Sequence, residues 1–243
     1  MAAIETKPVD LMHLGDRISL DFANTGAHDL LQSYDGFINW CSRAGIVSPQ
    51  QGRALIAAAA KDRSAEARAL SDARELREII TRIFTANAEG SGPSEQDLLS
   101  INGFHARAMA ASRIRRSAEG FDITFDSVTG PLDWPLNRIA WSSGQLLMGR
   151  KLDRVKICSD RDCRRLFIDG SRNRSRRWCD MSGCGNRAKA RRHYRRITGK
   201  DGEVRAAVGK RAGIPEKSGA RRPVAQDSDR PRGIPDVEIG STD

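Results

Sequence analysis

The sequence has no apolar run of the length that a membrane-spanning helix needs, about 18 residues. Its first ten residues, 1–10, contain no apolar segment after a basic start, so we expect no signal peptide. These absences predict a cytoplasmic protein whose cysteines stay reduced and whose partners do not include a membrane.

Motifs typical of common enzyme sites are also missing. The sequence contains no Gly-rich phosphate loop, no nucleophile elbow and no HExxH pattern. Its carboxylates are scattered among arginines, a pattern typical of solvated helix faces. We therefore predict that the protein is not an enzyme and has no catalytic residue.

What the sequence does have is five cysteines, four of them in two equally spaced pairs. Cys158 and Cys163 enclose four residues, as do Cys179 and Cys184, and fifteen residues separate the pairs. Such pairs are typical of a four-sulfur zinc site. In an oxidising compartment, the alternative is that the four cysteines form two disulfides. Four protein ligands leave no open coordination position, so we predict one structural Zn²⁺.

Short elements surround these cysteines. Residues 154–157 and 165–168 are predicted to be strands, and residues 175–178 a return strand. Ser182 is predicted to cap a final helix that carries Cys184 in its first turn. A hairpin followed by a helix that carries the last ligand is a treble-clef-like arrangement.

The same segment holds the positive charge of the chain. From Arg154 to Arg196 there are fifteen Lys and Arg against four Asp, a net +11, whereas the whole chain carries +10. Dense positive charge on a small scaffold is typical of nucleic-acid binding, and Arg suits bidentate contacts to phosphate and guanine. An acidic protein partner is the alternative.

The candidate nucleic-acid contacts lie in the loop after the first cysteine pair and in the final helix. In the helix, Arg187, Arg191 and Arg195 recur at every fourth residue and are expected on one helix face. The full set is Arg172, Arg174, Arg176, Arg177, Asn186, Arg187, Lys189, Arg191, Arg192 and Arg195.

Cys184-Gly185-Asn186-Arg187, with the flanking residues 167–169 and 177–179, resembles the signature of the CGNR zinc finger. The resemblance covers about forty residues and its motif is specific. It implies a bacterial transcription regulator whose finger binds DNA.

A second motif lies near the start. Alternating apolar residues in 18–22 predict a short strand, followed by a polar cluster of Asp21, Asn24 and Thr25. This stretch resembles the LDFxNT opening of the ABATE domain, a region named for stress-induced transcription regulation that commonly precedes a CGNR finger. The cluster is a candidate ligand-binding site; the alternative is that it caps a helix or pins a loop.

Helices are predicted for most of the chain before the finger. Ser48 and Ser94 are predicted to begin two of them, residues 112–125 to form a hairpin, and residues 135–152 a last helix. The predicted buried stripes are Phe37, Trp40, Cys41 and Ala44; Ala69, Ala73, Leu76, Ile80 and Ile83; and Leu98, Ile101, His105 and Met109. On its stripe, Cys41 is expected to be a core thiol and not a fifth zinc ligand.

We therefore predict an α+β protein in three parts. Residues 11–152 form a mostly helical ABATE-like regulatory domain with a small β-hairpin, and residues 153–198 form a treble-clef-like zinc finger. Residues 199–243 contain four of the nine prolines and no aromatic residue, which predicts a disordered tail.

The predicted function is zinc-dependent DNA binding by a transcription regulator, with finger arginines clamping the phosphate backbone. The alternative is an N-terminal ligand-binding or enzymatic domain with the finger as an RNA- or protein-docking module. A polar pocket around Asp21, Asn24 and His105 would favour that alternative. The sequence leaves open the oligomeric state and the identity of any small-molecule effector.

Overall fold

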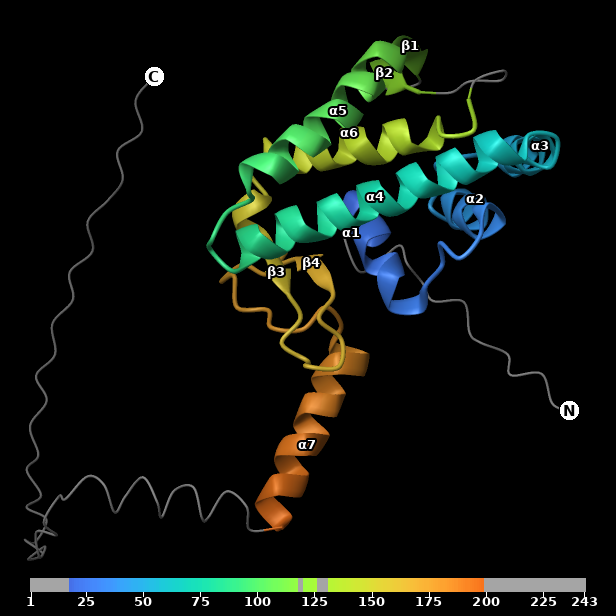
Figure 1. The fold of residues 1–243 in the computed structure, drawn as a ribbon. Helices are drawn as coiled ribbons and strands as arrows, with labels where there is room; N and C mark the ends of the chain where they lie inside the picture. Colours follow the sequence, from blue (N-terminus) through green and yellow to red (C-terminus); the bar gives the residue numbers. More distant parts are fainter. Residues whose placement is uncertain (1–17, 118–119, 126–130, 199–243) are drawn as a thin grey trace, which may run out of the picture. The chain divides into compact units, whose positions relative to one another are not determined.

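The computed structural model describes residues 18–117, 120–125 and 131–198. Helices predominate and two small antiparallel sheets complete the fold, which confirms the predicted α+β class (Figure 1). The described residues as far as Tyr194 form one compact unit. The tail predicted for residues 199–243 lies outside the described residues. No helix in the described ranges is long and apolar enough to cross a membrane.

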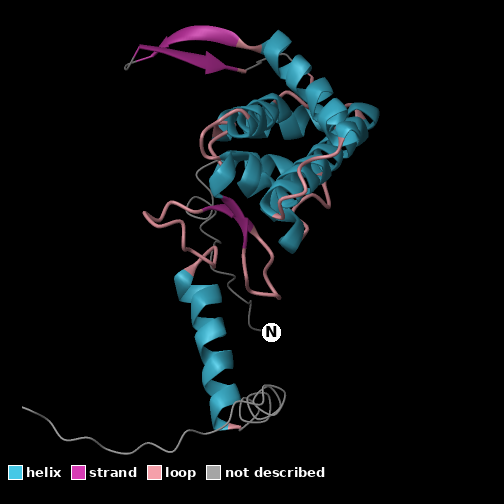
Figure 2. Cartoon of the chain, turned by 90° about the vertical axis from the view of Figure 1, so that its left-hand side faces the viewer, coloured by secondary structure: helices cyan, strands magenta, loops and turns pink. Residues whose placement is uncertain are grey.

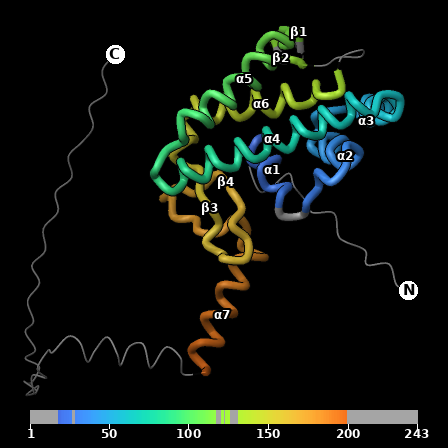
Figure 3. Tube along the Cα trace, viewed as in Figure 1, coloured from blue at the N-terminus to red at the C-terminus, as the bar shows by residue number. Residues whose placement is uncertain are grey.

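The helices from α1 to α5 follow one another through short connections, whereas a β-hairpin lies between α5 and α6 (Figure 3). Ser48 and Ser94 cap two of them as predicted, and Gln51 completes a capping box with Ser48. The bounds are α1 Ile18–Ala23, the 3-10 helix η2 Asn24–His28, α2 Tyr34–Arg43, α3 Pro49–Ala59, α4 Arg63–Ala88, α5 Glu95–Ala111 and α6 Pro135–Leu147.

Helix α1 shows that the strand predicted for residues 18–22 was wrong. Ser19, Leu20 and Phe22 are all buried in this short helix. A short apolar segment that is buried on several sides has the same pattern in a helix and in a strand, so its alternation did not distinguish the two.

Helix α4 contributes the longest apolar stripe to the core. It packs against α1, α2 and α5, and its five predicted stripe residues are all buried. In α2 the thiol of Cys41 is fully buried among apolar side chains, as predicted, and burial raises its pKa. Cys41 is therefore a core residue, and it lies outside the cysteine cluster described below.

Two predictions for the middle of the chain need correction. Leu98 and Met109 are exposed, whereas Ile101 is buried as predicted and forms the buried face of α5 together with Phe104 and Ala108. Helix α6 starts at Pro135 as predicted but ends at Leu147, five residues early. Its C-cap is Met148, which leaves a turn before the finger.

The predicted hairpin in the middle of the chain is confirmed. Strand β1, Arg113–Ser117, pairs antiparallel with β2, Gly120–Thr124 (magenta in Figure 2). A second antiparallel pair, β3 Val155–Ile157 and β4 Leu166–Ile168, matches two of the strands predicted for the finger.

The β3–β4 pair shares its core with the helices. Val155, Leu166 and Ile168 belong to the same buried cluster as the stripe of α4, and Figure 1 shows both strands next to this helix. Asn24 adds two hydrogen bonds to the backbone of Leu166: its Nδ2 donates to the carbonyl oxygen at 2.9 Å, and its Oδ1 accepts from the N–H at 3.0 Å. Asn24 thus pairs with β4 much as a neighbouring strand would.

Asn24→Ala tests this attachment. The substitution leaves both backbone groups of Leu166 without a partner in a part-buried position, so we expect the free energy of unfolding to fall by about 2 kcal/mol. Urea denaturation of the zinc-loaded protein measures the change. Asn102→Ala, on an exposed position of α5, is the matched control and should stay within about 0.5 kcal/mol of the wild type. Equal stability of the two variants would contradict a structural role of Asn24.

Candidate zinc centre and basic surface

The four paired cysteines converge on one point. The sulfur atoms of Cys158, Cys163, Cys179 and Cys184 all lie within 4.8 Å of one another, and Cys163 is the most exposed of the four residues. The Sγ atom of Cys179 lies 3.6 Å from that of Cys163 and 3.7 Å from that of Cys184. A disulfide would bring sulfur atoms to about 2 Å, so these cysteines are not bonded in pairs.

This geometry fits a zinc ion. Four sulfur atoms at about 2.3 Å from a tetrahedral zinc ion are about 3.8 Å apart, close to the two separations above. Burial raises the pKa of Cys179 and raises that of Cys184 to about 12, whereas hydrogen bonds outweigh burial at Cys158 and lower its pKa. A divalent cation bound to the four sulfur atoms would favour their thiolate form. Four sulfur ligands fill the coordination shell, which makes the site structural.

The backbone of the two cysteine loops sets the direction of the sulfur atoms. The N–H of Cys158 donates to the carbonyl of Arg165 at 2.8 Å, and the N–H of Cys163 donates to that of Asp160 at 2.9 Å. The N–H of Cys179 donates to the sulfur of Cys158 at 3.5 Å. These hydrogen bonds attach the first cysteine loop to the residue that precedes β4, and they attach the second cysteine loop to the first.

The turn that carries Cys184 differs from the prediction. Asp180, and not Ser182, caps it: the carboxylate accepts from the N–H groups of Ser182 and Gly183. The segment η4, Met181–Gly185, is one turn of π-helix. Helix α7, Asn186–Ile197, begins only after it, so Cys184 precedes the helix. The return strand predicted for 175–178 is also wrong, because these residues form irregular structure.

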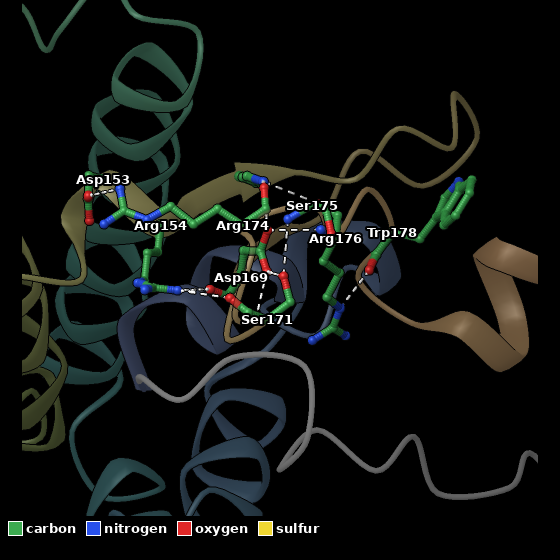
Figure 4. Close-up of polar contacts among 9 residues, drawn as sticks. Asp153, Arg154, Asp169, Ser171, Arg174, Ser175, Arg176 and Trp178 are labelled. Atoms are coloured by element: carbon green, nitrogen blue, oxygen red, sulfur yellow. Dashed lines mark hydrogen bonds and ion pairs between the residues drawn. The ribbon is translucent and has the colours of Figure 1, made fainter. Parts of the chain in front are cut away.

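A buried carboxylate organises the loop after β4 (Figure 4). Asp169 accepts hydrogen bonds from Lys156 Nζ at 2.6 Å, from the N–H of Ser171 at 2.9 Å and from the N–H of Arg176 at 2.9 Å. Burial raises the pKa of Asp169, but these hydrogen bonds outweigh it and hold the pKa below its usual range. The loop that carries Arg172 is thus folded around a charged centre.

A second buried carboxylate, Asp160, joins the first cysteine loop to α7. It accepts from Arg191 Nη2 at 2.5 Å and from Arg187 Nε at 2.8 Å. The guanidinium groups of Arg191 and Arg187 lower the pKa of Asp160 to about 2. Two predicted nucleic-acid contacts are therefore bound within the finger.

Other predicted contacts are also engaged by the chain itself. Arg174 pairs with Asp153, and Arg176 donates to the carbonyl oxygen of Trp178 at 2.8 Å (Figure 4). The side chain of Arg177 lies over the ring of Trp178. Asn186 donates to the carbonyl oxygen of Ser182 at 2.9 Å, within the turn that carries Cys184.

A smaller set of predicted contacts has no polar partner within the part of the chain that the structure describes. Arg172, Lys189, Arg192 and Arg195 are exposed, and their side chains have no hydrogen bond or ion pair with any described residue. Lys189 and Arg192 lie three residues apart in α7 and so share a helix face.

The polar cluster near the start is built into the fold. Asn24 binds the backbone of Leu166, and the Thr25 hydroxyl donates to the carbonyl oxygen of Phe22 at 2.6 Å. Asp21 is half-buried in α1. The cavity between α3, α4 and Leu132 is lined by none of these side chains, nor by His105, which stacks on Trp141.

Sequence reasoning missed the roles of Asp160 and Asp169. The sequence pattern assigns Asp160 only a negative charge and Asp169 only a turn and a place in the finger motif, although each is fully buried and accepts several hydrogen bonds. The position of Asp160 between Cys158 and Cys163 could have indicated its role. A carboxylate inside a loop that carries metal ligands lies close to the groups that hydrogen-bond to those ligands.

Cys179→Ser tests the metal site. Loss of one sulfur ligand should abolish stoichiometric zinc binding and unfold the finger, because metal binding supplies much of the folding energy of such a small unit. Plasma mass spectrometry of the purified protein measures the zinc content. Cys41→Ala is the matched control and should keep one zinc per chain. A full zinc load in the Cys179 variant would contradict the four-sulfur site.

Asp169→Asn tests the centre of the loop. The variant keeps the shape but removes the buried charge that Lys156 faces, so we expect the free energy of unfolding at pH 7 to fall by about 3 kcal/mol. Urea denaturation measures it. Asp153→Asn breaks an exposed ion pair and should cost less than about 1 kcal/mol. A similar, small loss in both variants would show that Asp169 does not organise the loop.

Comparison with protein families matches both parts of the chain. Residues 154–197 match the family described as "CGNR zinc finger", and residues 16–149 match ABATE, described as "Putative stress-induced transcription regulator". The second match covers more than half of the 243 residues. A search of curated proteins found no match. Both motifs recognised in the sequence are thus confirmed, and the chain belongs to the ABATE family and carries a CGNR zinc finger after its ABATE segment.

Proposed function

We propose that the protein is a cytoplasmic, zinc-dependent DNA-binding regulator of transcription and not an enzyme. One observation carries the proposal: Arg172, Lys189 and Arg192 are exposed and bind no described residue, whereas Arg187 and Arg191 are paired within the finger. Positive side chains without internal partners are free to bind an anion. The family descriptions, a transcription regulator and a zinc finger, support the same function.

The charge of the finger supports a nucleic acid as that anion. Its fifteen Lys and Arg face four Asp between Arg154 and Arg196, and the ion pairs of Asp160 and Asp169 involve three of those cations. Most of the excess therefore has no counter-charge inside the finger. Such an excess is typical of proteins that bind by releasing counterions from phosphates.

The contacts follow from which side chains are exposed. The shared face of Lys189 and Arg192 would bind phosphates on one strand, and Arg172 would add a contact from the loop around Asp169. Arg187 and Arg191 hold the scaffold instead. Contacts of this kind position a protein on duplex DNA, so sequence preference has to come from other groups or from DNA shape.

The helical part, proposed as a regulatory domain of residues 11–152, would control the finger of residues 153–198 through their shared core. Because β4 is bound by Asn24, a rearrangement near α1 would shift the strands that carry the first cysteine loop. An effector that favours one arrangement of the helices would thereby change DNA affinity.

Arg192→Ala and Lys189→Ala test the exposed face. Each variant should weaken binding to duplex DNA and reduce the slope of log affinity against log salt by about one unit, because one phosphate contact is lost. Fluorescence anisotropy at several salt concentrations measures the slope. Arg53→Ala, an exposed arginine of α3, is the matched control and should leave it unchanged. Equal slopes in all three variants would remove the α7 face from the interface.

A salt titration of the wild-type protein with and without zinc tests the function as a whole. Steep loss of duplex-DNA affinity with salt, seen only with zinc, is the expected result. Absence of binding at low salt would contradict DNA binding, and RNA or an acidic protein would then be the partner to test.

A further inference from the structure

Arg187 occupies a position between a cysteine sulfur and a buried carboxylate. Its Nη2 donates to the Sγ atom of Cys184 at 3.0 Å, and the same nitrogen lies 2.7 Å from Oδ2 of Asp160. Its Nε donates to that oxygen at 2.8 Å. The guanidinium therefore contacts one carboxylate oxygen through Nε and Nη2, and Nη2 also donates to the sulfur.

The carboxylate that holds Arg187 is itself fixed. Asp160 has no exposed side-chain surface, and its other oxygen accepts from Arg191 Nη2 at 2.5 Å. Arg191 in turn pairs with Asp162 at 3.2 Å. Asp160, which lies within the first cysteine loop, thus orients Arg187 and limits the directions in which the guanidinium can move.

We propose that Arg187 is a positioning residue of the zinc centre, which stabilises the Cys184 thiolate through an N–H···S hydrogen bond and is oriented by Asp160, and that it is not a nucleic-acid contact. The metal-ligating sulfur of Cys184 carries negative charge, and an ionised donor at 3.0 Å stabilises that charge directly. Groups that support metal ligands in this way typically change metal affinity about 10- to 100-fold when removed.

The other residues of the Cys184-Gly185-Asn186-Arg187 motif fit the same interpretation. Asn186 ties α7 to the carbonyl oxygen of Ser182, which fixes the turn that carries the ligand. A Cβ on Gly185 would come within 2.9 Å of the sulfur of Met181. Asn186 and Arg187 thus both bind groups in the turn that carries Cys184, in agreement with the role proposed for Arg187.

Lysine cannot replace the arginine fully. A single ammonium nitrogen on a flexible stem cannot reproduce two donors to Asp160 together with one to Cys184, whereas a planar guanidinium presents them in a fixed arrangement. Arg187→Lys therefore keeps the charge and loses the geometry, which separates a long-range electrostatic effect from a positioned hydrogen bond.

Zinc release to a chromogenic chelator is the first test. In the full-length protein, Arg187→Ala should release zinc at least about 10-fold faster than the wild type, and Arg187→Lys should lie between the two. Arg192→Ala removes an exposed arginine of the same helix and should release zinc at the wild-type rate. Equal release from the Arg187→Ala and Arg192→Ala proteins would overturn the proposal.

Cobalt substitution distinguishes a hydrogen bond to sulfur from a general loss of structure. In the cobalt-loaded proteins, loss of the N–H···S bond makes it easier for the thiolate to give an electron to the metal. The sulfur-to-cobalt charge-transfer band of both Arg187 variants should therefore move to longer wavelength. The Arg192→Ala band should not move. An unshifted band in Arg187→Lys, which keeps the charge and has the better chance to fold, would overturn the hydrogen bond even if zinc release were faster.

Discussion

The convergence of four cysteine sulfur atoms is the constraint on which the finger depends. Each of the two cysteine loops is too short and too polar to fold by burying apolar surface, and together they meet around one small cluster with Phe167. Negative charge at four thiolates is stabilised by positive groups besides the metal, and the finger places Arg187, held by Asp160, next to the sulfur of Cys184. Part of its positive charge is thus structural.

The finger is not an independent module attached to a helical domain. Its first two strands complete the apolar core of the helices, and Asn24 supplies β4 with the hydrogen bonds of a missing neighbour. Because Leu166 and Ile168 are buried in this shared core, we expect the two parts to move together. This contact is the route by which we propose that the helices control the finger.

The sequence predicted the parts of the structure that follow from local pattern. Cysteine spacing identified the metal cluster, and serine caps located α3 and α5. Local pattern could not tell the buried helix α1 from a strand, and it could not show which arginines are free, because the partners of Arg187 and Arg191 lie about thirty residues earlier. The role of Asn24 depends on a contact across most of the chain, which no spacing rule reveals.

The central claim is that the sulfur cluster and the helical core are one structure, and hydrogen–deuterium exchange of the full-length protein with and without zinc tests it most directly. Amides that depend on the shared core should lose protection together when zinc is removed. We expect faster exchange in β4 and also in α1 and around Asn87, whose side chain binds the carbonyl of Leu152. Faster exchange confined to residues 158–197 would contradict the claim.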